Sequence, residues 1–128
     1  MTWTRPALVG LAGLFMLVVV VQFFFGGMLA FSGRADGGDA HEFIGYPVLH
    51  LIPIVMIVVA LLGKMGKKLI GMSAGLLVMI FIQPIWASIE TDDTWVNAIH
   101  VPFALAIAFL GYHVLKAAMV AYRGEKAV

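Results

Sequence analysis

Residues 7–32 read ALVGLAGLFMLVVVVQFFFGGMLAFS, an apolar run without a charged side chain. A helix needs about 20 mostly apolar residues to cross the hydrocarbon layer of a membrane, so this run predicts a membrane-spanning helix. Three further runs with few charges follow, and the four together predict spans at about 7–32, 41–63, 69–89 and 95–117. Because the connections between them are short, we expect an all-α, up-down-up-down four-helix bundle.

The composition also indicates an integral membrane protein with one domain, residues 1–128. Of its residues, 62% are hydrophobic and 12% are charged, whereas a soluble domain carries about 25% charged residues. The predicted spans use nearly the whole chain and leave no room for a soluble domain. The formal net charge of +1 does not suggest a nucleic-acid partner. The lack of cysteine excludes disulfides, iron–sulfur clusters, thiolate-ligated haem and covalently attached c-type haem.

The charged residues separate into a basic and an acidic side of the predicted bundle. Seven of the eight Lys and Arg residues fall at the N-terminus, in the second connection or near the C-terminus, all on one side of an even-span protein. The other side carries Arg34 and six acidic residues: Asp36, Asp39, Glu42, Glu90, Asp92 and Asp93. Because cytoplasmic loops are enriched in Lys and Arg, we expect a multi-pass protein of the bacterial cytoplasmic membrane with both termini in the cytoplasm.

Local signals predict where the helices begin, bend and end. The Ser32–Gly33 turn is expected to end the first helix. Asp39 is expected to cap the second helix and Asp93 the fourth, since a carboxylate at a helix start accepts bonds from unpaired backbone N–H groups. Four prolines lie inside or near the predicted spans, and each lacks a backbone N–H and can therefore kink a helix: Pro47, Pro53, Pro84 and Pro102.

Two of the four histidines, His50 and His100, lie inside apolar runs. An ionisable side chain at membrane depth is costly and is usually retained for a function, so a ligand role is the first interpretation. The alternative is a structural histidine whose ring nitrogens are hydrogen-bonded within the bundle. His41 and His113 lie nearer the two membrane surfaces and are interpreted as interfacial. The candidate hydrogen-bond partners are Gln22, Tyr46, Gln83 and Asn97.

Two imidazoles on different helices at comparable depth suit one haem b with two axial histidine ligands. Neutral imidazole is a ligand of iron, and the flat, apolar macrocycle fits between helices. The haem propionates are expected at the wet end, where Arg34 can meet them. A catalytic zinc usually takes three protein ligands, and no carboxylate lies deep in the spans, so zinc is disfavoured. Two haems are disfavoured because the histidines of one helix do not share a face.

The sequence leaves the partner of His100 open between His50 and His41. Depth measured from the first apolar residue favours His50, whereas depth measured from the helix caps makes the two nearly equivalent. Gly45 lies one turn from His41 and is expected to admit an edge of the porphyrin. We prefer His50, with His41 as the alternative. No catalytic residue is predicted.

Four short motifs carry a resemblance to known proteins. The first span ends in Val21–Gly27 (VQFFFGG), the second contains His41–His50, the third has Gln83 near its outer end, and the fourth opens with Ala98–His100 (AIH). This pattern resembles one half of the haem A synthase bundle and also a family of small bacterial four-span proteins of unassigned function. The resemblance implies haem ligation by His100 and by a histidine of the second helix.

The chain differs from haem A synthase in three respects. It has half the spans, no His-Arg pair, and no cysteine pair in its first outer loop. The oxygenase chemistry of that family is therefore not carried over.

The leading functional hypothesis is a single-haem membrane cytochrome that exchanges electrons with a quinone or a partner subunit near the outer leaflet. A six-coordinate haem suits electron transfer because it leaves no position open for a substrate, and whether the chain is itself an enzyme is left open. The alternative is an accessory subunit of a larger respiratory or photosynthetic membrane complex, or a homo-oligomer, in which the histidines only form hydrogen bonds. A proton pathway is disfavoured because no Asp or Glu lies deep in the spans.

Overall fold

The computed structural model describes residues 2–32, 34–90 and 92–126, and within them all side chains except those of residues 34–36, 94, 125 and 126. The described residues form helices and no strand. In chain order the elements are α1 (Thr4–Ser32), α2 (Arg34–Phe43), the π-helix η1 (Ile44–Val48), α3 (Leu49–Leu62), α4 (Gly66–Ser88), α5 (Thr94–Ala98) and α6 (His100–Lys126).

Four helical segments are long and apolar enough to cross a membrane: Thr4–Ser32, Gly37–Leu62, Gly66–Ser88 and Trp95–Gly124. They confirm the predicted all-α class and the predicted number of membrane-length helices. Many of their large apolar side chains point outward; Leu17, Val20 and Phe109, for example, are each more than 60% exposed. Such an outer surface is compatible with a lipid bilayer, which solvates apolar side chains but not backbone polar groups.

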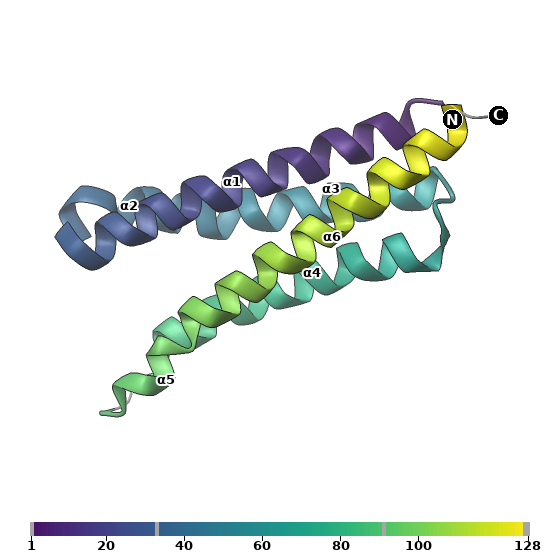
Figure 1. Ribbon diagram of the computed structural model, residues 1–128. Helices are drawn as coiled ribbons and strands as arrows, with labels where there is room; N and C mark the ends of the chain where they lie inside the picture. Colours follow the sequence, from purple (N-terminus) through teal and green to yellow (C-terminus); the bar gives the residue numbers. More distant parts are fainter. Residues whose placement is uncertain (1, 33, 91, 127–128) are drawn as a thin grey trace.

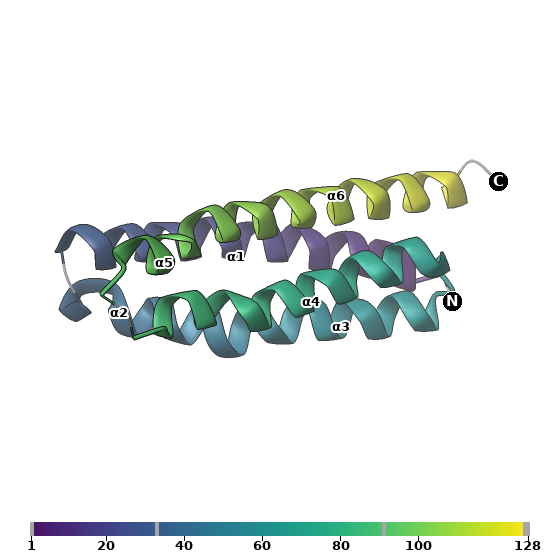
Figure 2. The same cartoon turned by 90° about the horizontal axis from the view of Figure 1, so that it is seen from below.

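The four long helices form an antiparallel bundle in which α1 and α4 each pack against both α3 and α6 (Figures 1 and 2). Both termini and the α3–α4 connection lie at one end of the bundle, which we call the basic end because it carries Lys64, Lys67 and Lys68 (Figure 1). Helices α2 and α5 lie at the opposite end, here called the acidic end. The connection at the basic end is tight, with Lys64 at φ 49° and Gly66 at φ 81°.

The buried core occupies the half of the bundle nearer the basic end. In α1 the buried residues are Thr4, Leu8, Ala12, Phe15 and Val19, a spacing of three or four that puts them on one helix face. The buried residues of α4 end at Ile80, although α1 continues to Ser32 and α4 to Ser88. Beyond this level the α1–α3 pair and the α4–α6 pair diverge toward the acidic end (Figure 1).

The first helix ends at Ser32 as expected, but the second begins at Arg34 rather than near residue 41. The prediction that Asp39 caps the second helix is therefore wrong, since Asp39 lies inside α2. The early start is allowed by Gly37, where an added Cβ would lie 2.9 Å from Met28 Cβ on α1. Asp93 does occupy the N-cap position of α5, but its side chain makes no capping hydrogen bond.

Proline accounts for both irregular segments at the acidic end. Pro47 lies inside η1, where the Leu49 N–H bonds to Ile44 O, five residues back. The wider turn accommodates a residue that has no N–H and whose ring would crowd the preceding turn. Pro102 follows the break between α5 and α6, because it cannot donate a hydrogen bond back to Ala98 O. His100 is consequently the first residue of α6.

Candidate functional site

Two glutamine–histidine pairs with matching hydrogen bonds lie toward the acidic end, beyond the buried core. In the first pair, Gln22 Nε2 of α1 donates to the His41 backbone oxygen at 2.9 Å, and His41 Nδ1 lies 3.3 Å from the Gln22 backbone oxygen. In the second, Gln83 Nε2 of α4 donates to the His100 backbone oxygen at 2.8 Å, and His100 Nδ1 lies 3.1 Å from the Gln83 backbone oxygen. Each pair therefore joins two helices that are consecutive membrane-length segments of the chain.

The hydrogen bonds fix the tautomer of both imidazoles. A carbonyl oxygen only accepts, so Nδ1 of His41 and of His100 must carry the ring proton. Nε2 of each neutral ring then keeps its lone pair. The Gln22 amide approaches His41 Nε2 at 3.4 Å, a length at which a hydrogen bond is weak. Both rings are thus in the tautomer that presents Nε2 to a metal ion.

The two imidazoles face each other across the bundle. Their ring centres lie 6.3 Å apart with an angle of 54° between the ring planes. His41 belongs to the second membrane-length segment and His100 to the fourth. The two rings therefore come from different helix pairs and lie between them. Both side chains are partly buried.

Two glycines leave the space that the first glutamine–histidine pair occupies. A Cβ at Gly26 would lie 3.1 Å from His41 Cε1 and 3.4 Å from its Nδ1. A Cβ at Gly45 would lie 2.9 Å from Gln22 Nε2. Gly45, expected to admit the edge of a porphyrin, here makes room for the glutamine amide that bonds to His41.

His50, the preferred partner of His100 in the sequence, has a different set of contacts. Its Nδ1 lies 3.1 Å from the backbone oxygen of Gly45. In an α-helix that oxygen would accept the N–H of Leu49, but here the Leu49 N–H bonds to Ile44 O. Its ring stacks on Tyr46 at 6.0 Å and meets the edge of Phe81 at 4.5 Å. These contacts match the structural interpretation of His50, which offers a donor to a backbone carbonyl at the π-helix.

The remaining predicted residues lie elsewhere or are not described. His113 contacts Phe109 and Tyr112, at ring-centre distances of 4.4 and 5.6 Å, within α6. It lines a cleft toward the basic end, far along α6 from His100. The side chain of Arg34, expected to meet haem propionates, lies outside the part of the chain that the structure describes.

Gln22 and Gln83 were expected as general hydrogen-bond partners and as parts of the resemblance motifs, but their pairing with His41 and His100 was not predicted. The signal in the sequence is a glutamine near the acidic end of the first and of the third membrane-length helix, followed after 19 or 17 residues by a histidine. Within the described residues, the side-chain oxygens of both glutamines are buried without a hydrogen-bond partner. Buried polar atoms are nearly always bonded, so a water molecule or a ligand donor is expected beside each.

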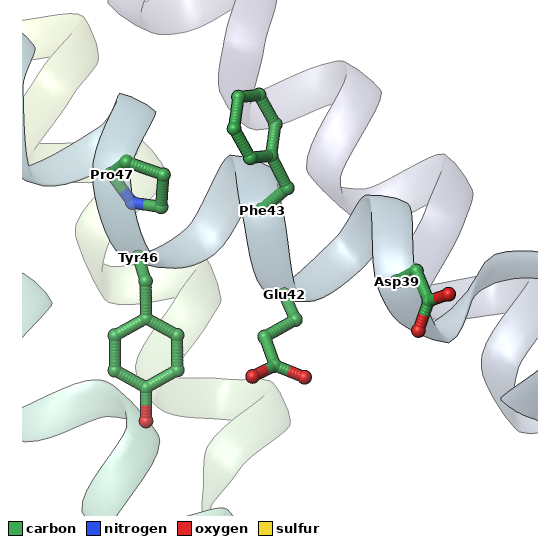
Figure 3. A pocket seen from close by; sticks show the side chains of 5 residues that line it. All are labelled: Asp39, Glu42, Phe43, Tyr46 and Pro47. Atoms are coloured by element: carbon green, nitrogen blue, oxygen red, sulfur yellow. The ribbon is translucent and has the colours of Figure 1, made fainter.

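A shallow hollow of about 430 Å³ lies on α2 and η1 next to this site. It is lined by Asp39, Glu42, Phe43, Tyr46 and Pro47 (Figure 3). Glu42 and Tyr46 extend toward the same side, and Phe43 extends away from them (Figure 3). Tyr46, which lines the hollow, also stacks on His50, and Glu42 is the sequence neighbour of His41.

Residues 22–91 match the family described as "Family of unknown function (DUF6220)". The matched region begins at Gln22, contains His41, His50 and Gln83, and ends before His100. No curated protein and no solved structure matches the chain. Since the family match covers more than half of the 128 residues, the chain belongs to the DUF6220 family.

Proposed function

We propose that this protein is a membrane-embedded b-type cytochrome in which His41 and His100 are the axial ligands of one haem. The observation that carries the proposal is the facing of two imidazoles from different helix pairs, each with Nδ1 directed at a backbone carbonyl. Metal-ligating histidines almost always donate their second ring N–H to a carbonyl or carboxylate, which fixes the tautomer and orients the ring. The proposal takes the alternative, His41, that the sequence left open beside His50.

The spacing of the rings fits two axial ligands. A bond from an imidazole nitrogen to a metal ion is about 2 Å long, so imidazoles on opposite sides of one ion have ring centres about 6 Å apart. The observed separation of 6.3 Å agrees with this estimate. No group of three or more His, Cys, Asp or Glu side chains that could hold a metal ion occurs among the described residues. Two imidazoles suit a metal whose other positions are filled by a macrocycle.

The depth of the two histidines is also compatible with a shared ligand. Both lie toward the acidic end, past the level where the buried residues of α1 and α4 end. His41 is four residues into its membrane-length segment and His100 five residues into its own, which corresponds to similar depths of about 6 and 8 Å. When bound, a bis-histidine haem supplies one-electron transfer without an open position for substrate. The chain's part is to orient both imidazoles.

The proposal includes a location and an electron partner. Placing the basic end in the cytoplasm of a bacterium puts the haem near the outer leaflet, in agreement with seven of eight Lys and Arg residues on the basic side. A quinone or a neighbouring subunit would then exchange electrons from the membrane. The hollow beside His41, with the carboxylate of Glu42 and the phenol of Tyr46, offers polar and aromatic contacts for a quinone head group.

The test is a visible absorption spectrum of detergent-purified protein, expressed with ample haem, before and after reduction with dithionite. We expect a sharp α-band on reduction, typical of low-spin b-type haem. His41→Ala and His100→Ala should each abolish this band. His50→Ala and His113→Ala are matched controls that remove an imidazole from the same two segments and should retain it.

Each outcome discriminates between the interpretations. A featureless wild-type spectrum would overturn the cytochrome proposal and favour the cofactor-free accessory subunit, whose complex could then be identified by co-purification. Loss of haem in His50→Ala with retention in His41→Ala would replace His41 by His50 as the ligand. Undiminished haem in His100→Ala would refute the ligand pair altogether.

A further inference from the structure

A cleft between α4 and α6 toward the basic end has features of a second binding site. It has a volume of about 620 Å³. Lys68, in the first turn of α4, lines it from one side, and His113 and Lys116 of α6 line it from the other. Its apolar wall is formed by side chains such as Met65, Met72 and Leu110. The cleft thus combines cationic groups from two helices with an apolar surface.

The electrostatic environment of the cleft favours an anion. No Asp or Glu is among the described residues that line it. The helix α4 begins at this end of the bundle and directs the positive end of its helix dipole toward it. The single acidic residue that the sequence places on this side is Glu125. An anion bound between Lys68 and Lys116 would relieve the repulsion between two like charges.

We propose that this cleft binds the phosphate head group of an anionic phospholipid, with an acyl chain lying against the apolar wall. A free inorganic anion would use the lysines but leave the apolar wall without a partner. A zwitterionic lipid would place an acyl chain against the apolar wall, but its head group would also bring a cation toward the lysines. Basic pockets between membrane helices bind anionic head groups in this way, and lysine side chains reach the head-group level while their stems cover apolar surface.

The experiment is a lipid titration of the intact, detergent-purified protein by native mass spectrometry. Phosphatidylglycerol and phosphatidylcholine with identical acyl chains are the two probes. We expect phosphatidylglycerol to bind about tenfold more tightly than phosphatidylcholine to the wild type, and this preference to be lost in the double variant Lys68→Ala/Lys116→Ala. The matched control, Lys64→Ala/Lys67→Ala, removes the same charge from the same end outside the cleft and should keep the preference.

Further arms separate charge from folding and lipid from free phosphate. Lys68→Arg/Lys116→Arg keeps both cations and should restore binding, and all variants should elute from a sizing column like the wild type. Equal binding of the two lipids to the wild type, or equal loss in both lysine pairs, would overturn the proposal. Displacement of phosphatidylglycerol by millimolar inorganic phosphate would identify a free-phosphate site instead. The comparison of the two lipids and the displacement by phosphate need only the wild-type protein, so they test the proposal even where a double variant does not fold.

Discussion

The backbone carbonyl of a glutamine fixes the protonated nitrogen in each of the two site histidines. Gln22 and Gln83 each use two groups, an amide that donates to the histidine backbone and a carbonyl faced by the imidazole Nδ1. The carbonyl belongs to a helix backbone, so a substitution of the glutamine side chain leaves it in place. Orientation of the rings therefore depends mainly on how closely the helices approach, and at the Gln22–His41 pair this approach has glycine on both sides, at Gly26 and Gly45.

Gly26→Ala is predicted to disturb the site, whereas Gly27→Ala is predicted to leave it intact. A Cβ at Gly26 would be 3.1 Å from His41 Cε1, so the ring must shift and the 3.3 Å contact from its Nδ1 must lengthen further. A Cβ added at Gly27 would have no neighbouring side chain or other helix within 4 Å. In the proposed cytochrome, loss of the orienting bond should weaken haem retention by about tenfold or more, as for other groups that orient metal ligands.

The measurement is the rate of haem transfer from each variant to an excess of a soluble haem acceptor, followed by the visible spectrum. Gly27→Ala should match the wild type in this assay and gain up to about 1 kcal/mol in helix stability, because alanine favours the helix. Equal transfer rates for the two alanine variants would contradict the role given to Gly26.

At the scale of elements, the π-helix lies between His41 and His50 and changes the angle between them from the value for an ideal α-helix. A turn that closes from residue i to i+5 shifts the angular position of everything before it relative to everything after it. Residues 34–43 therefore do not continue the face that α3 presents. His41 turns toward His100, and His50 turns toward Tyr46 and Phe81. Counting residues along an ideal helix could not predict which of the two histidines turns toward His100, because the π-helix around Pro47 lies between them.

The same element explains what the sequence could predict. The four apolar runs were sufficient for the number of membrane-length helices. The prolines indicated the irregular segments at Pro47 and Pro102, but Pro53 and Pro84, which were also expected to be able to kink a helix, lie inside α3 and α4, and these helices continue past them. The start of the second helix was not predictable from Asp39, because the position of α2 depends on contact of Gly37 with α1, a tertiary interaction. Gln22 and Gln83 were recognisable as polar residues in apolar helices, but their partners required the relative depth of two helices.

Gly111→Ala is predicted to destabilise the packing of α6 against α1. Gly111 is buried, and a Cβ there would lie 2.7 Å from Phe15 Cε1 and 3.0 Å from Met16 Sδ. Phe15 is itself fully buried, so it has little space into which to move. Overpacking of this kind costs about 1–3 kcal/mol. Thermal unfolding of the detergent-purified protein, followed by circular dichroism, should show a clearly lower midpoint.

Gly75→Ala on α4 provides the comparison for this substitution. Its added Cβ would meet Leu110 Cδ2 at 3.6 Å, an ordinary van der Waals contact, so its midpoint should equal or exceed that of the wild type. An unchanged midpoint for Gly111→Ala would show that α1 and α6 can separate without cost. The close approach of the two helices would then not contribute to stability.

The whole molecule divides its tasks between its two ends. The basic end holds the tightly packed core and the cationic cleft between α4 and α6. The acidic end holds the facing histidines, where the helix pairs diverge (Figure 1). The hydrophobic core residues of all four long helices thus lie together in one half, and the facing histidines lie in the other. This division matches the distribution of charge along the chain, because the basic residues gather where lipid phosphates are expected.

The orientation of the bundle is the last prediction, and the composition makes it simple to test. The chain has no cysteine, so a single introduced cysteine reports its own location without background. Asp92 and Lys67 are exposed on the acidic and basic sides respectively. Because Lys and Arg are retained on the cytoplasmic side, a membrane-impermeant maleimide should label Asp92→Cys in intact cells. Lys67→Cys should be labelled only after the membrane is permeabilised. The reverse pattern would place the histidine pair near the cytoplasmic leaflet and require its electron partner to be sought on that side.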